Sequence, residues 1–123
     1  MPNFQTNSKN SYDLEERTAK FGESIIDFVK MIVQNNINGP LINQLVRSAT
    51  SIGANYAEAN CASSKKNFRN KIYICKKECN ETKHWLRMLT KCEPDKKEKC
   101  QQLWQEVYEL TLIFSKISTM HCK

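Results

Sequence analysis

Side chains able to bind a metal ion or transfer protons are few in this chain. Glu81 and His84 form a Glu-x-x-His pair, which in a helical bundle is one part of a di-iron carboxylate site. Such a site needs a second pair and two further inward-facing glutamates, and the only other histidine is His121. The sequence therefore argues against a di-iron centre.

The six cysteines are Cys61, Cys75, Cys79, Cys92, Cys100 and Cys122. Cys75 and Cys79 are spaced as half of a zinc site, which Cys61, Cys100 or Cys122 would have to complete. Thiols at apolar helical positions more often fill a core, and no secretory signal pattern accompanies them. We expect reduced, packed thiols, with no bound metal and no cofactor.

Catalytic chemistry has little support in the sequence. A serine or cysteine nucleophile needs a histidine base and an orienting acid in one pocket, and the two histidines are poorly placed for that. There is also no glycine-rich phosphate loop or dinucleotide fingerprint. The sequence predicts a protein that is not an enzyme and has no small-molecule substrate.

Positive charge is concentrated in residues 63–92, which hold nine of the nineteen Lys and Arg and only two acids, Glu78 and Glu81. On a helix, most of these cations fall within about 120° of one another, together with Tyr73. We call this set the basic arc: Lys65, Lys66, Arg69, Tyr73, Lys76, Lys77, Lys83, Arg87 and Lys91. A cationic stripe with an aromatic residue between the charges is typical of nucleic-acid binding, although a solvated helix face is the alternative.

The spacing of apolar residues predicts long helices throughout the 123-residue chain, which has only three glycines and three prolines. We expect helices at about 11–35, 40–60, 63–92 and 96–121, forming one domain over 11–122 after a flexible segment, 1–10. Short connections favour an all-α, antiparallel up-and-down four-helix bundle. The predicted core stripes include Leu14, Phe21, Ile25, Phe28, Ile32, Leu41, Leu45, Ala49, Ile52, Tyr56, Ala59, Phe68, Ile72, Cys75, Cys79, Leu86, Leu89, Leu103, Val107, Leu110, Phe114 and Ile117.

Helix ends carry local signals of their own. Ser11 is a candidate cap of the first helix, Pro40 is suited to the first turn of the second, and Ser63 or Ser64 is suited to cap the third. The segment Glu93-Pro94-Asp95 should end the third helix.

The predicted helix at 40–60 has only two charged side chains, Arg47 and Glu58, and carries apolar or small residues around most of its circumference. A second subunit would cover the face that its own bundle leaves open, so we expect a homo-oligomer. The expected interface residues are Ile42, Val46, Trp104, Tyr108 and Leu112.

Polar residues next to the apolar stripes of the second and third helices predict a structural network. Its members are Arg47, Ser51, Asn55, Glu58, Glu78 and Glu81. Polar groups this close to a core need partners, and Arg47 is placed to pair with Glu78 or Glu81. We expect this network to fix the register of the helices.

The order Arg47-Ser48-x-x-Ser51-Ile52-x-x-Asn55-x-x-Glu58, followed by Glu78-x-x-Glu81-Thr82-x-x-Trp85-Leu86, resembles the signature of a bacterial family of small four-helix bundles. The family includes proteins encoded in intervening sequences of large-subunit ribosomal RNA genes. It also resembles the accessory variability determinant of diversity-generating retroelements.

The resemblance implies an oligomer, as in the pentameric, positively charged barrel of the retroelement determinant, and association with RNA and a reverse transcriptase. The alternative is a protein-interaction scaffold of unassigned role, as in the intervening-sequence branch. No run of eighteen apolar residues and no signal pattern are present, so we expect a cytoplasmic protein without membrane contact.

Overall fold

The computed structural model describes the backbone of residues 8–120 and the side chains of residues 13–120. Four long helices and one short 3-10 turn make up this part of the chain, and it contains no strand. The helices are α1 (Ser8–Val29), α2 (Asn38–Asn60), α3 (Lys65–Cys92) and α4 (Lys97–Met120), with the turn η1 (Pro94–Lys96) between the last two. The all-α prediction is confirmed.

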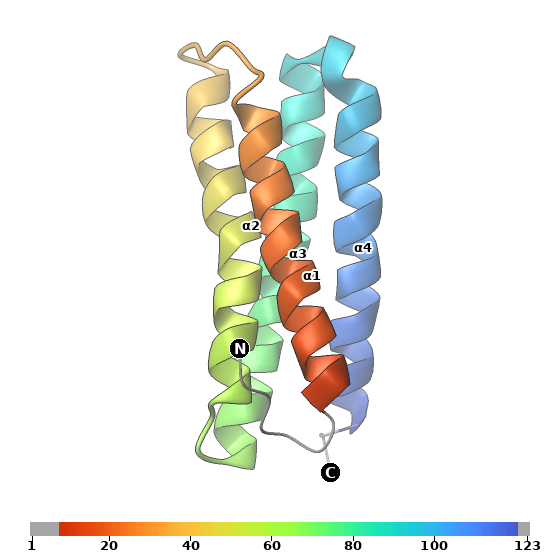
Figure 1. The fold of residues 1–123 in the computed structure, drawn as a ribbon. Coiled ribbons are helices and arrows are strands. Elements are labelled where there is room, and N and C mark those ends of the chain that lie inside the picture. Colours follow the sequence, from red (N-terminus) through yellow and green to blue (C-terminus); the bar gives the residue numbers. More distant parts are fainter. Residues whose placement is uncertain (1–7, 121–123) are drawn as a thin grey trace.

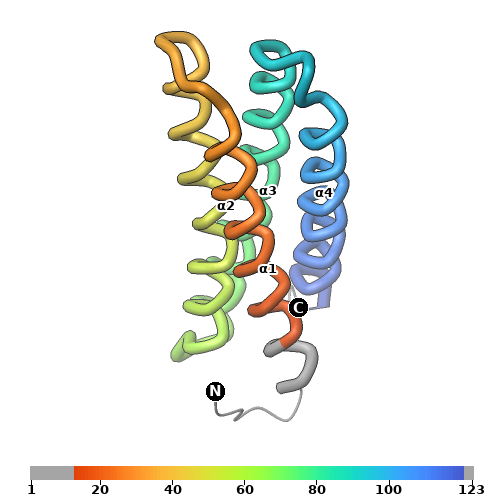
Figure 2. Tube along the Cα trace, turned by 45° about the horizontal axis from the view of Figure 1, so that its top comes forward, coloured from red at the N-terminus to blue at the C-terminus, as the bar shows by residue number. Residues whose placement is uncertain are grey.

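The helices run up and down in chain order around a single core (Figure 1). Each helix packs against the next one along the chain, and α1 also packs against α4, whereas α1 and α3 make no contact within the described residues. These two helices are therefore diagonal to each other. Figures 1 and 2 show α1 leaning, so that its N-terminal part lies near α4 and its C-terminal part near α2.

The core is the one that the helical spacing predicts. Phe28, Leu45, Ile72 and Phe114 are at most 1% exposed, and the buried side chains come from all four helices. Leu41, Phe68 and Ile117 are only partly buried, because they lie on the margins of their stripes. No helix in the described part of the chain is long and apolar enough to span a membrane.

The connection between α1 and α2 differs from the predicted one. Whereas the sequence predicts a helix from 11 to 35, α1 begins at Ser8 and ends at Val29. Ser11 is therefore inside the helix and does not cap it, and Ser8–Asn10 of the predicted flexible segment are helical. The rest of that segment, residues 1–7, lies outside the described residues, as does the predicted last helical residue, His121.

Two asparagines explain why α2 begins at Asn38, two residues before the predicted start. The Asn35 side-chain oxygen accepts hydrogen bonds from the backbone N–H groups of Ile37 and Asn38, both at 2.8 Å, and so caps α2 from outside it. Asn38 is fully buried, and its amide donates to the Val33 carbonyl at 3.1 Å and to Glu93 Oε2 at 3.0 Å. The first connection is thereby tied to the end of α3.

The start of α3 follows the local signal. Ser64 adopts an extended backbone, and its hydroxyl accepts a hydrogen bond of 3.1 Å from the Asn67 backbone N–H. At the other end, Glu93 directly follows the helix and Pro94 opens η1. The predicted cap at Ser64 and the predicted stop at 93–95 are both confirmed.

The second face of α2 packs in part against α1, so a partner subunit is not needed to cover that part, whereas Ala57 of the same face stays exposed. Glycines allow the close approach: an added Cβ at Gly53 would lie 3.2 Å from Thr18 Oγ1, and one at Gly22 would lie 3.5 Å from Thr50 Cγ2. Ile42 is 2% exposed within its own protomer, so it is not available as an interface residue. Val46 is partly buried and packs against the same core.

We predict that Asn38→Ala lowers the free energy of unfolding by about 2 kcal/mol, because it leaves the Val33 carbonyl and Glu93 without their buried donor. Asn36→Ala, in the same connection but at an exposed position, should change it by less than about 0.5 kcal/mol. Urea denaturation of both variants measures the difference, and equal stabilities would contradict the role of Asn38.

Candidate nucleic-acid interface

The basic arc lies on the side of α3 that faces away from the core. The buried residues Ile72, Cys75 and Leu86 take up the opposite side of the helix and so set its rotation. The structure exposes Lys65, Lys66, Tyr73, Lys77, Arg87 and Lys91 and leaves Arg69, Lys76 and Lys83 partly buried. Tyr73 is 65% exposed, so its ring is available to a ligand. The predicted residues therefore share one surface in the structure.

Both acids of α3 turn away from this surface toward α2. Arg47 Nη1 lies 3.3 Å from Glu78 Oε1, and Arg47 Nη2 lies 2.5 Å from Glu81 Oε1. Glu78 is 7% exposed, so its charge is nearly buried and depends on this partner. Because Arg47 pairs with both carboxylates, neither acid of α3 lies among the cations of the basic arc.

A buried hydroxyl pair lies next to this ion pair. The Ser48 and Thr82 hydroxyl oxygens are 2.9 Å apart, and each is also within hydrogen-bond distance of a carbonyl of its own helix. Both side chains are fully buried between α2 and α3. Ser48 lies in the polar stripe of α2 that the sequence identifies, but its contact with Thr82 was not predicted, although both positions belong to the signature described above.

Other predicted members of the network make separate contacts. The Ser51 hydroxyl donates to the Arg47 carbonyl at 2.6 Å, and the Asn55 amide donates to the Ser51 carbonyl at 2.9 Å, both within α2. Glu58 pairs with Lys71 of α3 at 2.5 Å, more than two turns along α2 from Arg47. Of the six residues, Arg47, Glu78, Glu81 and Glu58 therefore contribute to two separate ion-pair sites between α2 and α3, whereas Ser51 and Asn55 bond within α2.

On its other flank, α3 meets two aromatic residues of α4. Trp104 and Tyr108 stack with their ring centroids 5.4 Å apart and their planes 8° from parallel. The ammonium of Lys83 lies 5.7 Å from the first ring centroid and 5.6 Å from the second. Lys83 therefore joins the basic arc to these rings by cation–π contacts.

Charge is divided between diagonal helices. The sequence of α3 carries nine Lys or Arg and two acids, whereas that of α1 carries five acids and three basic residues. Because α1 and α3 lie on opposite sides of the bundle, the molecule has one strongly basic side and one weakly acidic side. A polyanion is attracted to the α3 side and repelled by the α1 side.

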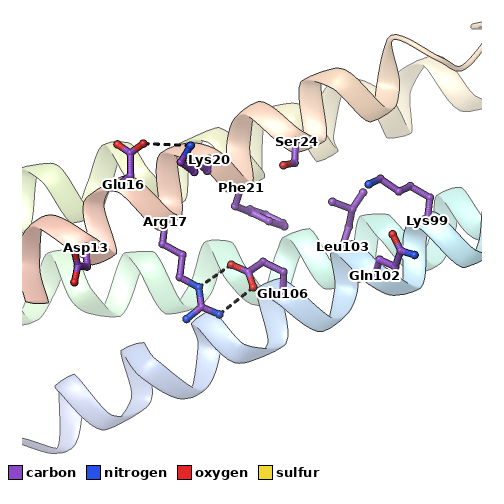
Figure 3. A pocket seen from close by; sticks show the side chains of 10 residues that line it. All are labelled: Asp13, Glu16, Arg17, Lys20, Phe21, Ser24, Lys99, Gln102, Leu103 and Glu106. Atoms are coloured by element: carbon purple, nitrogen blue, oxygen red, sulfur yellow. Dashed lines mark hydrogen bonds and ion pairs between the residues drawn. The ribbon is translucent and has the colours of Figure 1, made fainter.

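A groove of about 450 Å³ separates α1 from α4 (Figure 3). Arg17 bridges it, with Nε 2.8 Å from Glu106 Oε2 and Nη2 2.8 Å from Glu109 Oε1. Hydrogen bonding to Glu106 raises the pKa of Arg17, and hydrogen bonds from Gln105 and then Arg17 lower the pKa of Glu109. Lys20 pairs with Glu16 at the same groove, and no histidine or cysteine lines it.

The candidate metal ligands do not come together. Glu81 turns to Arg47, whereas His84 is exposed beside Trp85, with ring centroids 4.9 Å apart. Burial raises the pKa of both the Cys75 and the Cys79 thiol to about 12. Among the described residues, no group of three or more His, Cys, Asp or Glu is arranged to hold a metal ion. Cys122 lies outside these residues.

Comparisons with known proteins agree with the sequence signature. Residues 10–116 match the family model of the 23S rRNA-intervening sequence protein. A solved structure from Bacteroides thetaiotaomicron VPI-5482, described as a protein with unknown function from the S23 ribosomal protein family, is 30% identical with a TM-score of 0.81. That match covers 89% of this chain and 97% of the other. No curated protein matches the chain.

We predict that Arg47→Met destabilises the fold by about 1–2 kcal/mol, because it leaves the nearly buried Glu78 without its cation. Adding Glu78→Gln should recover part of this loss, since the uncompensated charge is then removed. Glu81→Gln alone should cost less than about 0.5 kcal/mol, because that pair is more exposed. Thermal unfolding of these variants tests the assignment, which fails if Arg47→Met is as stable as the parent.

The buried thiols predict a loss of stability at alkaline pH. Their folded pKa of about 12 exceeds the ordinary value of 9.0, so their stabilisation is complete below pH 9 and declines as the pH rises toward 12. At pH 10 each thiol should cost on the order of 1 kcal/mol of stability relative to pH 7. Denaturation at both pH values should show a smaller alkaline loss in a Cys75→Ala/Cys79→Ala variant. An identical loss in parent and variant would contradict this origin.

Proposed function

The chain belongs to the 23S rRNA-intervening sequence protein family, and from its charge distribution we propose that it is a non-enzymatic protein that binds nucleic acid. The basic arc of α3 is the phosphate-binding surface. The single observation that supports this most strongly is that Arg47 holds both acids of α3 on the α2 side, away from the lysines.

The geometry of α3 suits an extended phosphate backbone. Lys65 and Lys91 lie 26 residues apart on one continuous helix, a rise of about 39 Å. Basic side chains recur along this whole length, so that several phosphates are neutralised at once and their condensed counterions are released. Tyr73, exposed in the same surface, offers a ring to a base.

A homo-oligomer is part of the proposal. Copies arranged in a ring, such as the pentameric barrel that the resemblance implies, would bring several basic arcs to one nucleic acid and raise the overall affinity without any new contact. Native mass spectrometry of the purified protein gives the number of copies. Association with a reverse transcriptase rests on the same resemblance, and an adjacent reverse transcriptase gene would support it.

A second candidate is a protein-interaction scaffold, which the exposed aromatic residues of α4 favour. Trp104, Tyr108 and Leu112 are 38%, 37% and 51% exposed, and aromatic side chains are enriched in protein interfaces. A scaffold of this kind needs the lysines of α3 only for solubility, so it should bind no nucleic acid even at low salt.

We predict that Lys66→Glu/Lys77→Glu/Lys91→Glu weakens binding to a labelled oligonucleotide by 10-fold or more, on the order expected for three lost phosphate contacts. The slope of log K against log salt should fall by about 2. Fluorescence anisotropy at several salt concentrations measures both quantities.

The matched control is Lys30→Glu/Lys99→Glu/Lys116→Glu, which changes three exposed lysines outside α3. Both triple variants lower the formal net charge from +6 by the same six units. The control should lose much less affinity, because its lysines lie outside the basic arc. Equal losses would show a general charge effect, and no binding by the parent protein at low salt would rule out the proposed function.

A further inference from the structure

The stacked pair Trp104 and Tyr108 occupies an unusual position for two large aromatic residues. They are one turn apart on α4 and more than a third exposed, while Val107 and Thr111 take the core positions beside them. Their rings are nearly parallel and held by the ammonium of Lys83. The two rings therefore lie stacked at the surface, partly open to solvent.

This aromatic pair is continuous with the basic arc. Lys83 belongs to the arc and contacts both rings. Arg87 follows Lys83 by one turn of α3 and is exposed, so a second cation extends along the same flank of the helix. A strand whose phosphates follow the basic arc therefore passes beside the two rings, on the α4 side.

Only an unpaired base can use such rings. In a duplex the bases are stacked inside the helix and present only their edges in the grooves, whereas in a single strand a base can turn outward and stack on an aromatic side chain. Positive charge alone does not distinguish the two forms, because both carry phosphates. The combination of arc and rings therefore favours single strands.

We propose that Trp104 and Tyr108 stack on an unpaired base of a single-stranded nucleic acid whose phosphates lie along the basic arc, with Lys83 at the junction. This inference rests on the proposed function and adds to it the class of nucleic acid. Charge complementarity distinguishes this occupant from a second protein copy, which would bury the positive charges of Lys83 and Arg87 in the interface.

The test compares a labelled 12-nucleotide single strand with the duplex of the same sequence at low salt, using fluorescence anisotropy. The parent should bind the single strand more tightly. Trp104→Leu and Tyr108→Leu keep an apolar side chain but remove the ring, and each should weaken single-strand binding by about 10-fold while changing duplex binding by less than about 2-fold. Trp104→Phe should retain most of the affinity, and Leu112→Ala, an exposed neighbour on α4, should retain all of it.

Tryptophan fluorescence provides a second readout, because the chain has only two tryptophans, Trp85 and Trp104. Stacking of a base on Trp104 should quench the emission when the single strand is added. In Trp104→Phe the quenching should disappear although the strand still binds, since the remaining Trp85 is partly buried against the core. Quenching that persists in this variant would contradict contact at Trp104.

The remaining outcomes separate the two proposals. Loss of binding in the lysine variant of α3 together with unchanged single-strand binding by Trp104→Leu would overturn the stacking inference and leave the proposed function standing. Equal weakening of single-strand and duplex binding would overturn it as well. A smaller native mass of Trp104→Leu than of the parent would identify the rings as a subunit interface instead. Absence of all binding by the parent would overturn both proposals.

Discussion

The rotation of α3 about its own axis determines what this protein presents to solvent. Successive residues of a helix are 100° apart, so a rotation by about one residue position would exchange buried and exposed side chains. The apolar residues Ile72, Cys75 and Leu86 hold one side of the helix in the core. The basic arc is exposed because it occupies the other side.

Polar contacts make this rotation more specific than apolar packing alone. Glu78 is nearly buried, and a buried carboxylate without a partner is strongly destabilising, so orientations that separate it from Arg47 are penalised. The Ser48 and Thr82 hydroxyls add a second requirement, because both are fully buried and meet only in this register. A different rotation would also bury lysines, at a cost of several kcal/mol each. In this interpretation the polar residues between α2 and α3 act on function indirectly, by fixing where the cations point.

The sequence predicted the parts of the fold that depend on local patterns. Positions such as Phe21, Ile25 and Phe28 repeat at helical spacing, and this repeat identified the core correctly. The start of α2 was predicted two residues too late, because it depends on the side-chain contacts of Asn35 and Asn38, and Asn38 is bonded to Glu93, 55 residues away in the sequence. The prediction that Ile42 is an interface residue was wrong, because a helical wheel shows which face of a helix is apolar but not which neighbour covers that face. Ile42 is in fact buried within its own protomer.

The same limitation applies to the candidate surface. Counting charges along the sequence identified the basic arc, since its members belong to one helix, but it gave no reason to connect Lys83 with Trp104 or Tyr108, which lie on the next helix. The tertiary structure makes that connection, and it gives the two parts of the surface different physical roles.

Attraction between lysines and phosphates acts over about 10 Å and weakens with salt, so it brings a strand to the protein whether the strand is single or paired. Stacking acts only at contact and is open only to an unpaired base, so the proposed selection of single strands would arise after the strand has arrived. In the proposed function, a surface built across α3 and α4 therefore separates the capture of a strand from the discrimination between single strands and duplexes, which neither helix would achieve alone.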